Sequence, residues 1–306
     1  MNVLVTGGCG FIGSHIVDRL VDAGHTVAVA DNLSTGNLEH LNPAAKLYRV
    51  DIREQELRGV FEDFRPDAVY HEAAQIDIQT SIRDVGLDAQ INVLGTVRVL
   101  ECCRDFQVGK LIYASSAAVY GNPEYLPVDE AHPVAPMSFY GVSKLTPEYY
   151  IKAFSGLYGL RYTILRYANV YGVRQDPKGE GGVVSIFTDK LLAGEAPVIF
   201  GDGEQTRDFV YVRDIAGANL AALTRGDNQT VNVSTGVQTS VNALLRAMAP
   251  GVQAEYRPAR AGDIKDSFLD NRRLREILGY SIQYPLAEGL RETMEYYRDK
   301  RARASK

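Results

Sequence analysis

A glycine-rich segment near the start of the chain constrains the fold more than any other feature. TGGCGFIG (residues 6–13) follows the short apolar run NVLVT and opens the amphipathic stretch FIGSHIVDRLVDAG. Gly7 allows a tight turn, Gly10 lets backbone approach a pyrophosphate at the helix N-terminus, and Gly13 permits close packing of the helix on the strand. A merely tight strand-to-helix turn is the alternative. The context favours a dinucleotide-binding unit.

The rest of the first half continues this alternation of strand and helix. Apolar runs at TVAVAD, KLYRVDI, PDAVYHEAA and KLIYASS are separated by longer amphipathic stretches, and further strands are expected at 161–169 and 230–236. Buried strands joined by helices predict right-handed crossovers and a parallel sheet covered on both faces. The fold class is therefore α/β, a doubly wound parallel (Rossmann) sheet with a smaller C-terminal substrate-binding region.

An acidic residue at the end of the second strand identifies the dinucleotide. Asp31 lies 18 positions after Gly13, where a carboxylate can accept both hydroxyls of an adenosine ribose. The same carboxylate would repel a 2′-phosphate, and DNLSTG offers no arginine to receive one, so NAD is favoured over NADP. Asp51 and Ile52, at the end of the third strand, are placed to touch the adenine, although an ordinary cap at the end of a strand explains this pair nearly as well.

The regular alternation ends near residue 170. We expect residues 1–170 to form the NAD-binding domain, with part of 205–240 returning to it, and 171–306 to be mainly substrate-binding. Within the second part, PVIFGDGEQTRDFVYV has the pattern of a hairpin that turns at Asp202 and Gly203.

Composition excludes several other classes of function. The chain has 306 residues, 45% hydrophobic content and a formal net charge of -5, with no run of Lys and Arg interleaved with aromatics, so no nucleic-acid partner is expected. Cys9, Cys102 and Cys103 form no CxxC pair or metal-spaced cluster, which predicts no metal site and fits a reducing cytoplasm. The apolar start is too short for a signal segment, and no run is long enough to cross a membrane.

The stretch YGVSK places Tyr140 and Lys144 four positions apart, on one face of an expected helix. A neighbouring ammonium favours phenolate over phenol and lowers the pKa of a tyrosine toward the range of a useful base. Ser116, just past another strand, is expected at the same sheet edge, where ligands bind in such folds.

With these motifs in place, the chain resembles the UDP-glucose 4-epimerase family of the extended short-chain dehydrogenase/reductase superfamily. The resemblance runs through TGGCGFIGSH, DNLSTG, HEAAQ, NVLGT, SSAAVYG, YGVSK, RYANVYG, GDGEQTRDFVYVRD and RPARAGD. It implies NAD as cofactor, a UDP-sugar as substrate and a nucleotide-sugar-binding C-terminal region. It also implies that the cofactor pocket includes Phe11, Ile12, Asn32, Ala73, Ala74 and Asn92, together with Tyr140 and Lys144.

The resemblance also assigns roles in the reaction. Tyr140 is the base that removes the proton of the sugar hydroxyl at C4 while hydride leaves that carbon. Lys144 keeps the phenol acidic and binds the nicotinamide ribose, and Ser116 hydrogen-bonds the same sugar oxygen. Return of the hydride to the opposite face of a rotated 4-keto sugar inverts C4.

Positions that match substrate-binding residues follow in the second half of the chain. Positive charge suits a pyrophosphate, and the small side chain at Ser267 predicts room for an N-acetyl group at C2, so that UDP-GlcNAc and UDP-GalNAc are interconverted as well. The remaining matched positions are Asn169, Arg207, Arg260 and Asp263. Taken singly, each charged position could equally belong to a surface ion pair.

Other activities on this scaffold remain as alternatives. Ala117 and Ala118 stand where related 4,6-dehydratases carry an acidic pair, and alanine cannot move a proton, so elimination is disfavoured. An epimerase of another nucleotide sugar, such as UDP-glucuronic acid, is the nearest rival. A nucleotide-sugar reductase and a non-catalytic sensor of NAD are more distant ones.

Two residues depart from the family pattern, and one surface is expected to pair subunits. Glu72 replaces an apolar residue beside the nicotinamide site, and Pro147 falls inside the helix of Tyr140, where proline removes a hydrogen bond and usually kinks the axis. Relatives form homodimers through four-helix bundles. Here the bundle would use the helix that carries Val93, Val97 and Leu100 and the YGVSK helix. That apolar stripe could also be ordinary core.

Overall fold

The computed structural model describes residues 1–177, 182–259 and 264–304. Its centre is a seven-stranded sheet in the order β11-β6-β5-β4-β1-β2-β3, with every neighbouring pair parallel. The strands are β1 (Asn2–Thr6), β2 (Thr26–Asp31), β3 (Lys46–Arg49), β4 (Ala68–His71), β5 (Lys110–Ser116), β6 (Arg161–Tyr167) and β11 (Gln229–Val233). The doubly wound parallel sheet is thus confirmed. Its order reverses between β1 and β4, the point at which such sheets bind ligands.

Helices cover both faces of this sheet because alternate strand residues point to opposite sides. On one face Val3, Val5 and Val29 pack against helices α1, α8 and α10, and on the other Leu4 and Ala28 pack against α2, α5 and α6. The bounds are α1 (Phe11–Asp22), α2 (Leu57–Phe64), α5 (Thr96–Asp105), α6 (Phe139–Tyr158), α8 (Val212–Ala222) and α10 (Arg272–Leu278).

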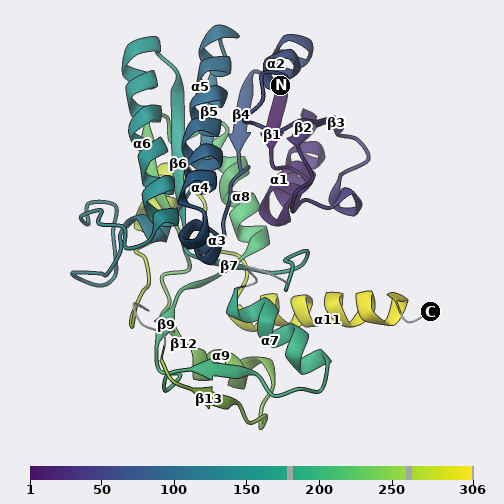
Figure 1. The fold of residues 1–306 in the computed structure, drawn as a ribbon, viewed down its shortest axis with the longest axis vertical. Coiled ribbons are helices and arrows are strands. Elements are labelled where there is room, and N and C mark those ends of the chain that lie inside the picture. Colours follow the sequence, from purple (N-terminus) through teal and green to yellow (C-terminus); the bar gives the residue numbers. More distant parts are fainter. Residues whose placement is uncertain (178–181, 260–263, 305–306) are drawn as a thin grey trace.

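A smaller region lies at the end of the sheet opposite the N-terminus (Figure 1). Its core joins Phe187, Phe209, Tyr211, Leu244 and Leu290 from helices and short strands far apart in sequence. These elements are β7 (Asn169–Tyr171), α7 (Val183–Leu192), β8 (Val198–Phe200), β9 (Thr206–Arg207), β10 (Phe209–Tyr211), β12 (Thr239–Ser240), α9 (Val241–Met248), β13 (Glu255–Arg257) and α11 (Leu286–Ala304).

The hairpin expected at Asp202 and Gly203 is wrong. Strand β8 pairs in parallel with β13, β9 pairs with β12, and β10 pairs in parallel with β7. Gly203 still makes a tight turn with φ of +77°, where Asn242 donates to the Asp202 carbonyl at 2.9 Å. The prediction of a turn is therefore confirmed, but the flanking strands find long-range partners rather than each other.

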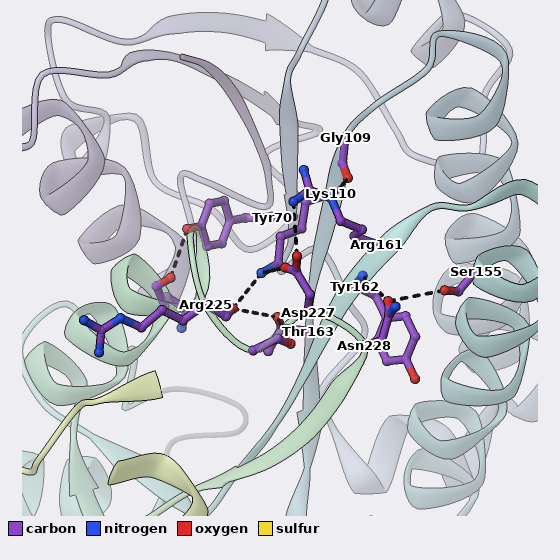
Figure 2. Close-up of polar contacts among 12 residues, drawn as sticks. Tyr70, Gly109, Lys110, Ser155, Arg161, Tyr162, Thr163, Arg225, Asp227 and Asn228 are labelled. Carbon is purple, nitrogen blue, oxygen red and sulfur yellow. Dashed lines mark hydrogen bonds and ion pairs between the residues drawn. The ribbon is translucent and has the colours of Figure 1, made fainter. Parts of the chain in front are cut away.

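Strand β11 is fastened to the main sheet by the loop before it, at the end away from the smaller region. Lys110 is only 2% exposed, and its ammonium donates to the Arg225 carbonyl and to the Asp227 carboxylate, both at 2.6 Å. Arg161 reaches Asp227 at 3.1 Å, and Thr163 donates to the Gly226 carbonyl at 2.8 Å. Figure 2 shows these side chains converging on the loop from two adjacent strands. This network fixes the end of the segment that returns to the sheet.

Shorter helical segments lie between β2 and β3, between β4 and α5, and between β5 and α6. In α6, 20 residues continue through the buried Pro147 without a break. The segment before α5 widens into a π-helix, a form that often occurs at functional sites. The short segments are η1 (Leu38–His40), α3 (Ile78–Arg83), α4 (Val85–Ala89), η2 (Gln90–Gly95) and η3 (Ala117–Val119).

Two expectations about surfaces are tested by this fold. Leu100 is 0% exposed and belongs to the core under the sheet, so it cannot contact a second subunit, while Val93 and Val97 are half-buried. Among the described residues, no helix combines the length and apolar character that a membrane span requires.

Candidate active site

The glycine-rich loop between β1 and α1 leaves no room for side chains at Gly7 and Gly13, because backbone atoms lie too close. Gly7 has φ of +70°, and a Cβ atom there would lie 2.7 Å from the Ala73 nitrogen. A Cβ atom on Gly13 would lie 2.3 Å from the Gly7 carbonyl oxygen, which also accepts from the Gly10 nitrogen at 3.0 Å. Gly10 caps α1 without a side-chain hydrogen bond, so the first N–H groups of Phe11 and Ile12 can face an anion. These features fit the pyrophosphate of a dinucleotide.

Asp31 lies against this loop at the end of β2. The residue is 7% exposed, and its carboxylate accepts from the backbone nitrogens of Cys9 at 2.9 Å and Leu33 at 2.8 Å. Each carboxylate oxygen has a second acceptor direction, so the group can also accept from the hydroxyls of a ribose. The contact of Asp31 with the adenosine ribose stays a prediction.

Asp51 is already engaged by side chains. Arg53 donates to it through Nε at 2.9 Å and Nη2 at 2.8 Å, and Asn32 donates at 2.8 Å. The hydrogen bonds of Arg53 are the largest cause that lowers the pKa of Asp51, to about 2. Ile52 is buried and faces Gly95. The alternative of a cap at the end of a strand therefore describes Asp51 well, and the adenine contact stays a prediction.

Ser116, Tyr140 and Lys144 come together at the carboxyl end of β5. Ser116 ends β5, Tyr140 is the second residue of α6, and Lys144 follows one turn later. The Ser116 hydroxyl lies near enough to the Tyr140 phenol to lower its pKa, and the Lys144 ammonium lies 4.8 Å from the centre of the Tyr113 ring on β5. A Ser, Tyr and Lys set at this edge is suited to moving one proton between a substrate hydroxyl and the protein.

The direction in which the pKa of Tyr140 is shifted differs from the sequence expectation. Burial raises the pKa of Tyr140, and the neighbouring hydroxyl of Ser116, rather than the charge of Lys144, opposes this rise. Burial in turn lowers the pKa of Lys144 to about 8, against the raising effect of Glu72, Asp88 and Glu148. Burial of both members thus offsets much of the gain expected from placing an ammonium near the phenol.

Asn92 connects three motifs through its hydrogen bonds. From the π-helix η2, its amide donates to the Gln75 carbonyl at 2.8 Å and to the Ser143 hydroxyl at 3.0 Å, and accepts from the Gln75 nitrogen at 2.8 Å. The Gln75 side chain then donates to Asp88 at 2.8 Å. These bonds join Asn92 to the segment that follows Ala73 and Ala74 after β4, and the contact of these residues with the nicotinamide stays a prediction.

A buried ion pair that sequence reasoning missed connects α6 to the sheet. Arg166 donates to both oxygens of Glu148, at 2.9 and 2.6 Å, and Ser115 donates to the same carboxylate at 2.6 Å. Glu148 follows Lys144 by four residues and so shares its face of the helix, which was the available signal. Because these bonds link α6 to β5 and β6, they fix the position of the helix on the sheet.

The structure describes only some of the residues that were predicted to bind the substrate. Arg207 on β9 donates to the carbonyls of Thr206 at 2.7 Å and Lys265 at 3.3 Å, and the Ser267 nitrogen donates to Thr206 at 3.2 Å, so Arg207 and Ser267 are neighbours. Asn169 begins β7, and its nitrogen donates to the Asp208 carbonyl at 2.9 Å. Arg260 and Asp263 lie outside the described residues.

Over the ranges that the structure describes, no group of three or more His, Cys, Asp or Glu side chains could hold a metal ion. The dinucleotide loop, Asp31 and the Ser, Tyr and Lys set together define a short-chain dehydrogenase/reductase type of site on a Rossmann sheet. Residues 3–234 match the NAD dependent epimerase/dehydratase family, and the chain belongs to that family.

Solved structures of relatives agree over almost the full length. The chain is similar to UDP-glucose 4-epimerase from Thermotoga maritima with UDP-glucose (45% identity, TM-score 0.95, 98% of this chain and 99% of that one). It is also similar to the Thermus thermophilus UDP-glucose 4-epimerase in complex with NAD (41%, TM-score 0.92, 97% and 99%). A third is the UDP-N-acetylglucosamine 4-epimerase of Methanobrevibacter ruminantium in complex with UDP-N-acetylmuramic acid (36%, TM-score 0.93, 98% of each chain).

Proposed function

We propose that this protein is an NAD-dependent UDP-glucose 4-epimerase that interconverts UDP-glucose and UDP-galactose through a 4-keto intermediate. The observation that supports the proposal most is that Ser116 ends β5 and Tyr140 and Lys144 begin α6 on the same sheet whose first strand leads into a glycine loop with no room for side chains. Bound NAD supplies the hydride acceptor at C4 and returns the hydride within each turnover.

The three side chains divide the proton chemistry. Tyr140 takes the proton of the C4 hydroxyl, Ser116 donates to the same oxygen, and Lys144 stabilises the phenolate and orients the ribose next to it. Ala117 and Ala118 directly follow Ser116 and offer no group that could remove a proton from C5, so water is not eliminated. The 4-keto sugar is therefore reduced again rather than dehydrated.

The nucleotide is held by the smaller region. Arg207 and Arg260 supply positive charge for the pyrophosphate, while Asn169 and Asp263 add polar contacts to the nucleoside diphosphate. Asp31 selects NAD over NADP, since its carboxylate would repel a 2′-phosphate.

Incubation of the purified protein with UDP-galactose and no added NAD tests this function. Because an epimerase recycles its cofactor, UDP-glucose should accumulate far beyond the amount of enzyme. Conversion that stops at one equivalent of protein, or that needs a continuous supply of NADH, would instead identify a reductase. Turnover of UDP-glucuronic acid in place of UDP-galactose would identify the uronic acid epimerase.

We also propose that N-acetylated hexoses are accepted. Ser267 is half-buried beside Arg207 and leaves more room than a tyrosine would, and a 36% identical relative is a UDP-N-acetylglucosamine 4-epimerase. Substitution Ser267→Tyr should reduce kcat/KM for UDP-GlcNAc at least about tenfold and leave that for UDP-glucose within about twofold, since the lost space is specific to the C2 substituent. Equal losses for both sugars would reject the role of Ser267.

A homodimer in the cytoplasm is proposed as the working form, in galactose metabolism. Apolar side chains remain exposed along α3, η2 and α6, and a patch of this kind on a soluble chain marks a contact surface. They are Ile78, Ile82, Leu94, Val142, Tyr149 and Tyr150. Sedimentation analysis should give about twice the chain mass, and Leu94→Glu with Val142→Glu should give the single-chain mass.

A further inference from the structure

Glu148 is a buried carboxylate on α6 that binds two strands of the sheet at once. It accepts from Nε and Nη2 of Arg166 on β6, at 2.9 and 2.6 Å, and from the hydroxyl of Ser115 on β5 at 2.6 Å. Glu148 is 0% exposed, and both of these partners are buried as well. The planar fork of an arginine matches the two oxygens of a carboxylate, so these bonds hold the carboxylate in one orientation.

On the side of β5, the carboxylate binds the residue next to a member of the site. Ser115 directly precedes Ser116, and Glu148 follows Lys144 by four residues on one face of α6. A short path therefore runs from the backbone of Ser116 through Ser115 to the turn of the helix that follows Lys144. Movement of α6 relative to Ser116 must lengthen or break the bond between Ser115 and Glu148.

On the side of β6, the same contact leads to the strand that precedes the dinucleotide loop. Tyr167 directly follows Arg166, and its hydroxyl donates to Glu72 at 3.1 Å. The Glu72 nitrogen donates at 3.2 Å to the carbonyl of Thr6, the last residue of β1. Through Arg166, α6 is therefore connected to the start of the cofactor loop as well as to Ser116.

Pro147 shows why this turn of α6 needs a contact from outside the helix. Proline has no N–H, so the carbonyl of Ser143, four residues earlier, lacks its usual hydrogen bond within the helix. The 20 residues of α6 nevertheless continue through the buried Pro147. Glu148 is the next residue, and its bonds to the sheet hold the helix beside the point where one of its own hydrogen bonds is missing.

Two further contacts hold the first half of α6, and each is a single hydrogen bond between neutral groups. Asn92 donates to the Ser143 hydroxyl at 3.0 Å, and Tyr113 donates to the Lys144 carbonyl at 3.2 Å. Hydrogen bonds to a charged group are about twice as strong as neutral ones. We therefore expect the bonds of Glu148 to contribute more to the placement of the helix than either of these.

We propose that Glu148 is a positioning residue that sets the place of Tyr140 relative to Ser116, a role that rests on the proposed epimerase function. Proton transfer requires both hydroxyl groups within reach of one sugar oxygen, and a displacement of about 1 Å costs about 10²-fold in rate. Glu148 itself exchanges no proton. Stability alone does not account for the pair, because apolar residues of the same volume are often at least as stabilising as a buried ion pair.

Replacement of all three partners by apolar residues tests position separately from stability. The triple variant combines Ser115→Ala, Glu148→Leu and Arg166→Met, so that none of the three is left as an unpaired polar group, and its urea midpoint should equal or exceed that of the wild type. With UDP-galactose, kcat per bound NAD should fall at least about tenfold, while KM stays within about twofold. An unchanged kcat overturns the proposal. A joint loss of bound NAD, stability and kcat would identify a purely structural pair and overturns it too.

Ser115→Ala removes only the bond to β5 and keeps every charge near the site. It should lower kcat at least about threefold, and Ser115→Thr, which keeps the hydroxyl, should retain most of the wild-type kcat. Thr163→Val is the matched control, because the buried Thr163 hydroxyl donates to the Gly226 carbonyl at 2.8 Å, at the end of β6 away from the site. It should leave kcat unchanged. Equal kcat values in Ser115→Ala and Thr163→Val would reject a specific role of the contact with Glu148.

Crystal structures of the wild type and the triple variant test the positioning without an activity assay. The distance between the Ser116 hydroxyl and the Tyr140 phenol should differ by about 0.5 Å or more, the tolerance of a productive geometry. An unchanged distance contradicts the role of Glu148. If the wild-type protein does not convert UDP-galactose, the proposed function fails, yet this comparison still decides whether Glu148 places Tyr140.

Discussion

At the scale of single residues, the site depends on a few ionisable groups whose burial disfavours their charged forms. Tyr140 and Lys144 are both desolvated, and each is tuned by a neighbour that can be named: Ser116 for the phenol and Glu72 for the ammonium. Tyr140 must ionise to act, yet burial opposes this, so the base is strong once formed and forms only where cations and donors assist it.

Replacement of Tyr140 by phenylalanine tests the proton acceptor. Tyr140→Phe should lower kcat for UDP-galactose by about 10²–10⁴-fold, the usual contribution of a positioned base. NAD binding should persist, because the glycine loop and Asp31 are untouched. Steady-state kinetics and the bound NAD content check both points. Tyr158→Phe, at the exposed end of the same helix, is the control, and retention of full activity by Tyr140→Phe would remove Tyr140 from the mechanism.

At the scale of elements, the site requires two helices at fixed distances from the sheet. The motif spacing was enough to predict that α1 starts at the glycine loop and that Tyr140 and Lys144 share a face of α6. It could not reveal the Glu148–Arg166 pair or the hydrogen bonds of Asn92, because these join residues that only the tertiary fold brings together. For the same reason the strands around Asp202 were wrongly joined as a hairpin.

The close contact of α1 with the loop can be tested at Gly13. A methyl group there would lie 2.3 Å from the Gly7 carbonyl oxygen, so Gly13→Ala must push the helix from the loop and should weaken NAD binding at least about tenfold. Calorimetric titration with NAD measures this. Gly59→Ala, whose added Cβ atom meets nothing within 4 Å on α2, should bind NAD as the wild type does. Equal affinity in both variants would refute the packing argument.

The loop that holds β11 gives a prediction of stability. Asp227→Ala leaves the ammonium of Lys110, which is 2% exposed, with the Arg225 carbonyl as its remaining acceptor in the described network. Loss of a partner from a buried ion pair costs about 3–5 kcal/mol, but Asp227 is 41% exposed and water can replace it in part. The free energy of unfolding should fall by about 2 kcal/mol in urea titrations. Lys110→Met with Asp227→Ala should recover most of that loss.

At the scale of the whole molecule, sequence reasoning predicted the architecture but not how its two parts meet. The alternation of strands and helices predicted the parallel sheet, and β11 pairs with β6 close to the expected residues. The junction depends instead on contacts such as that of His15 on α1 with the Val173 carbonyl, at 3.1 Å across 158 residues. No local pattern in the sequence distinguishes His15 from an ordinary helix residue.

This junction should be sensitive to acid. Burial, with the charges of Arg174 and Arg213, lowers the pKa of His15 from 6.5 to about 4, against the Val173 carbonyl and Asp18. The unfolded chain therefore binds this proton more tightly, and the contribution of His15 is full above pH 6.5 and is lost as the pH falls toward 4. At about 1.4 kcal/mol per pH unit, the loss reaches about 3 kcal/mol.

A variant is needed to isolate the contribution of His15. The pKa of Glu72 is raised to about 7, so its contribution to the free energy of unfolding increases as the pH falls over part of the same range. His15→Gln keeps an N–H donor for Val173 but cannot take up a proton. Urea unfolding of both proteins from about pH 7 to about pH 4 should show the variant gaining on the wild type by up to about 3 kcal/mol as the pH falls. Parallel curves would mean that His15 keeps an ordinary pKa in the folded chain, and the junction would then owe its acid sensitivity to other groups.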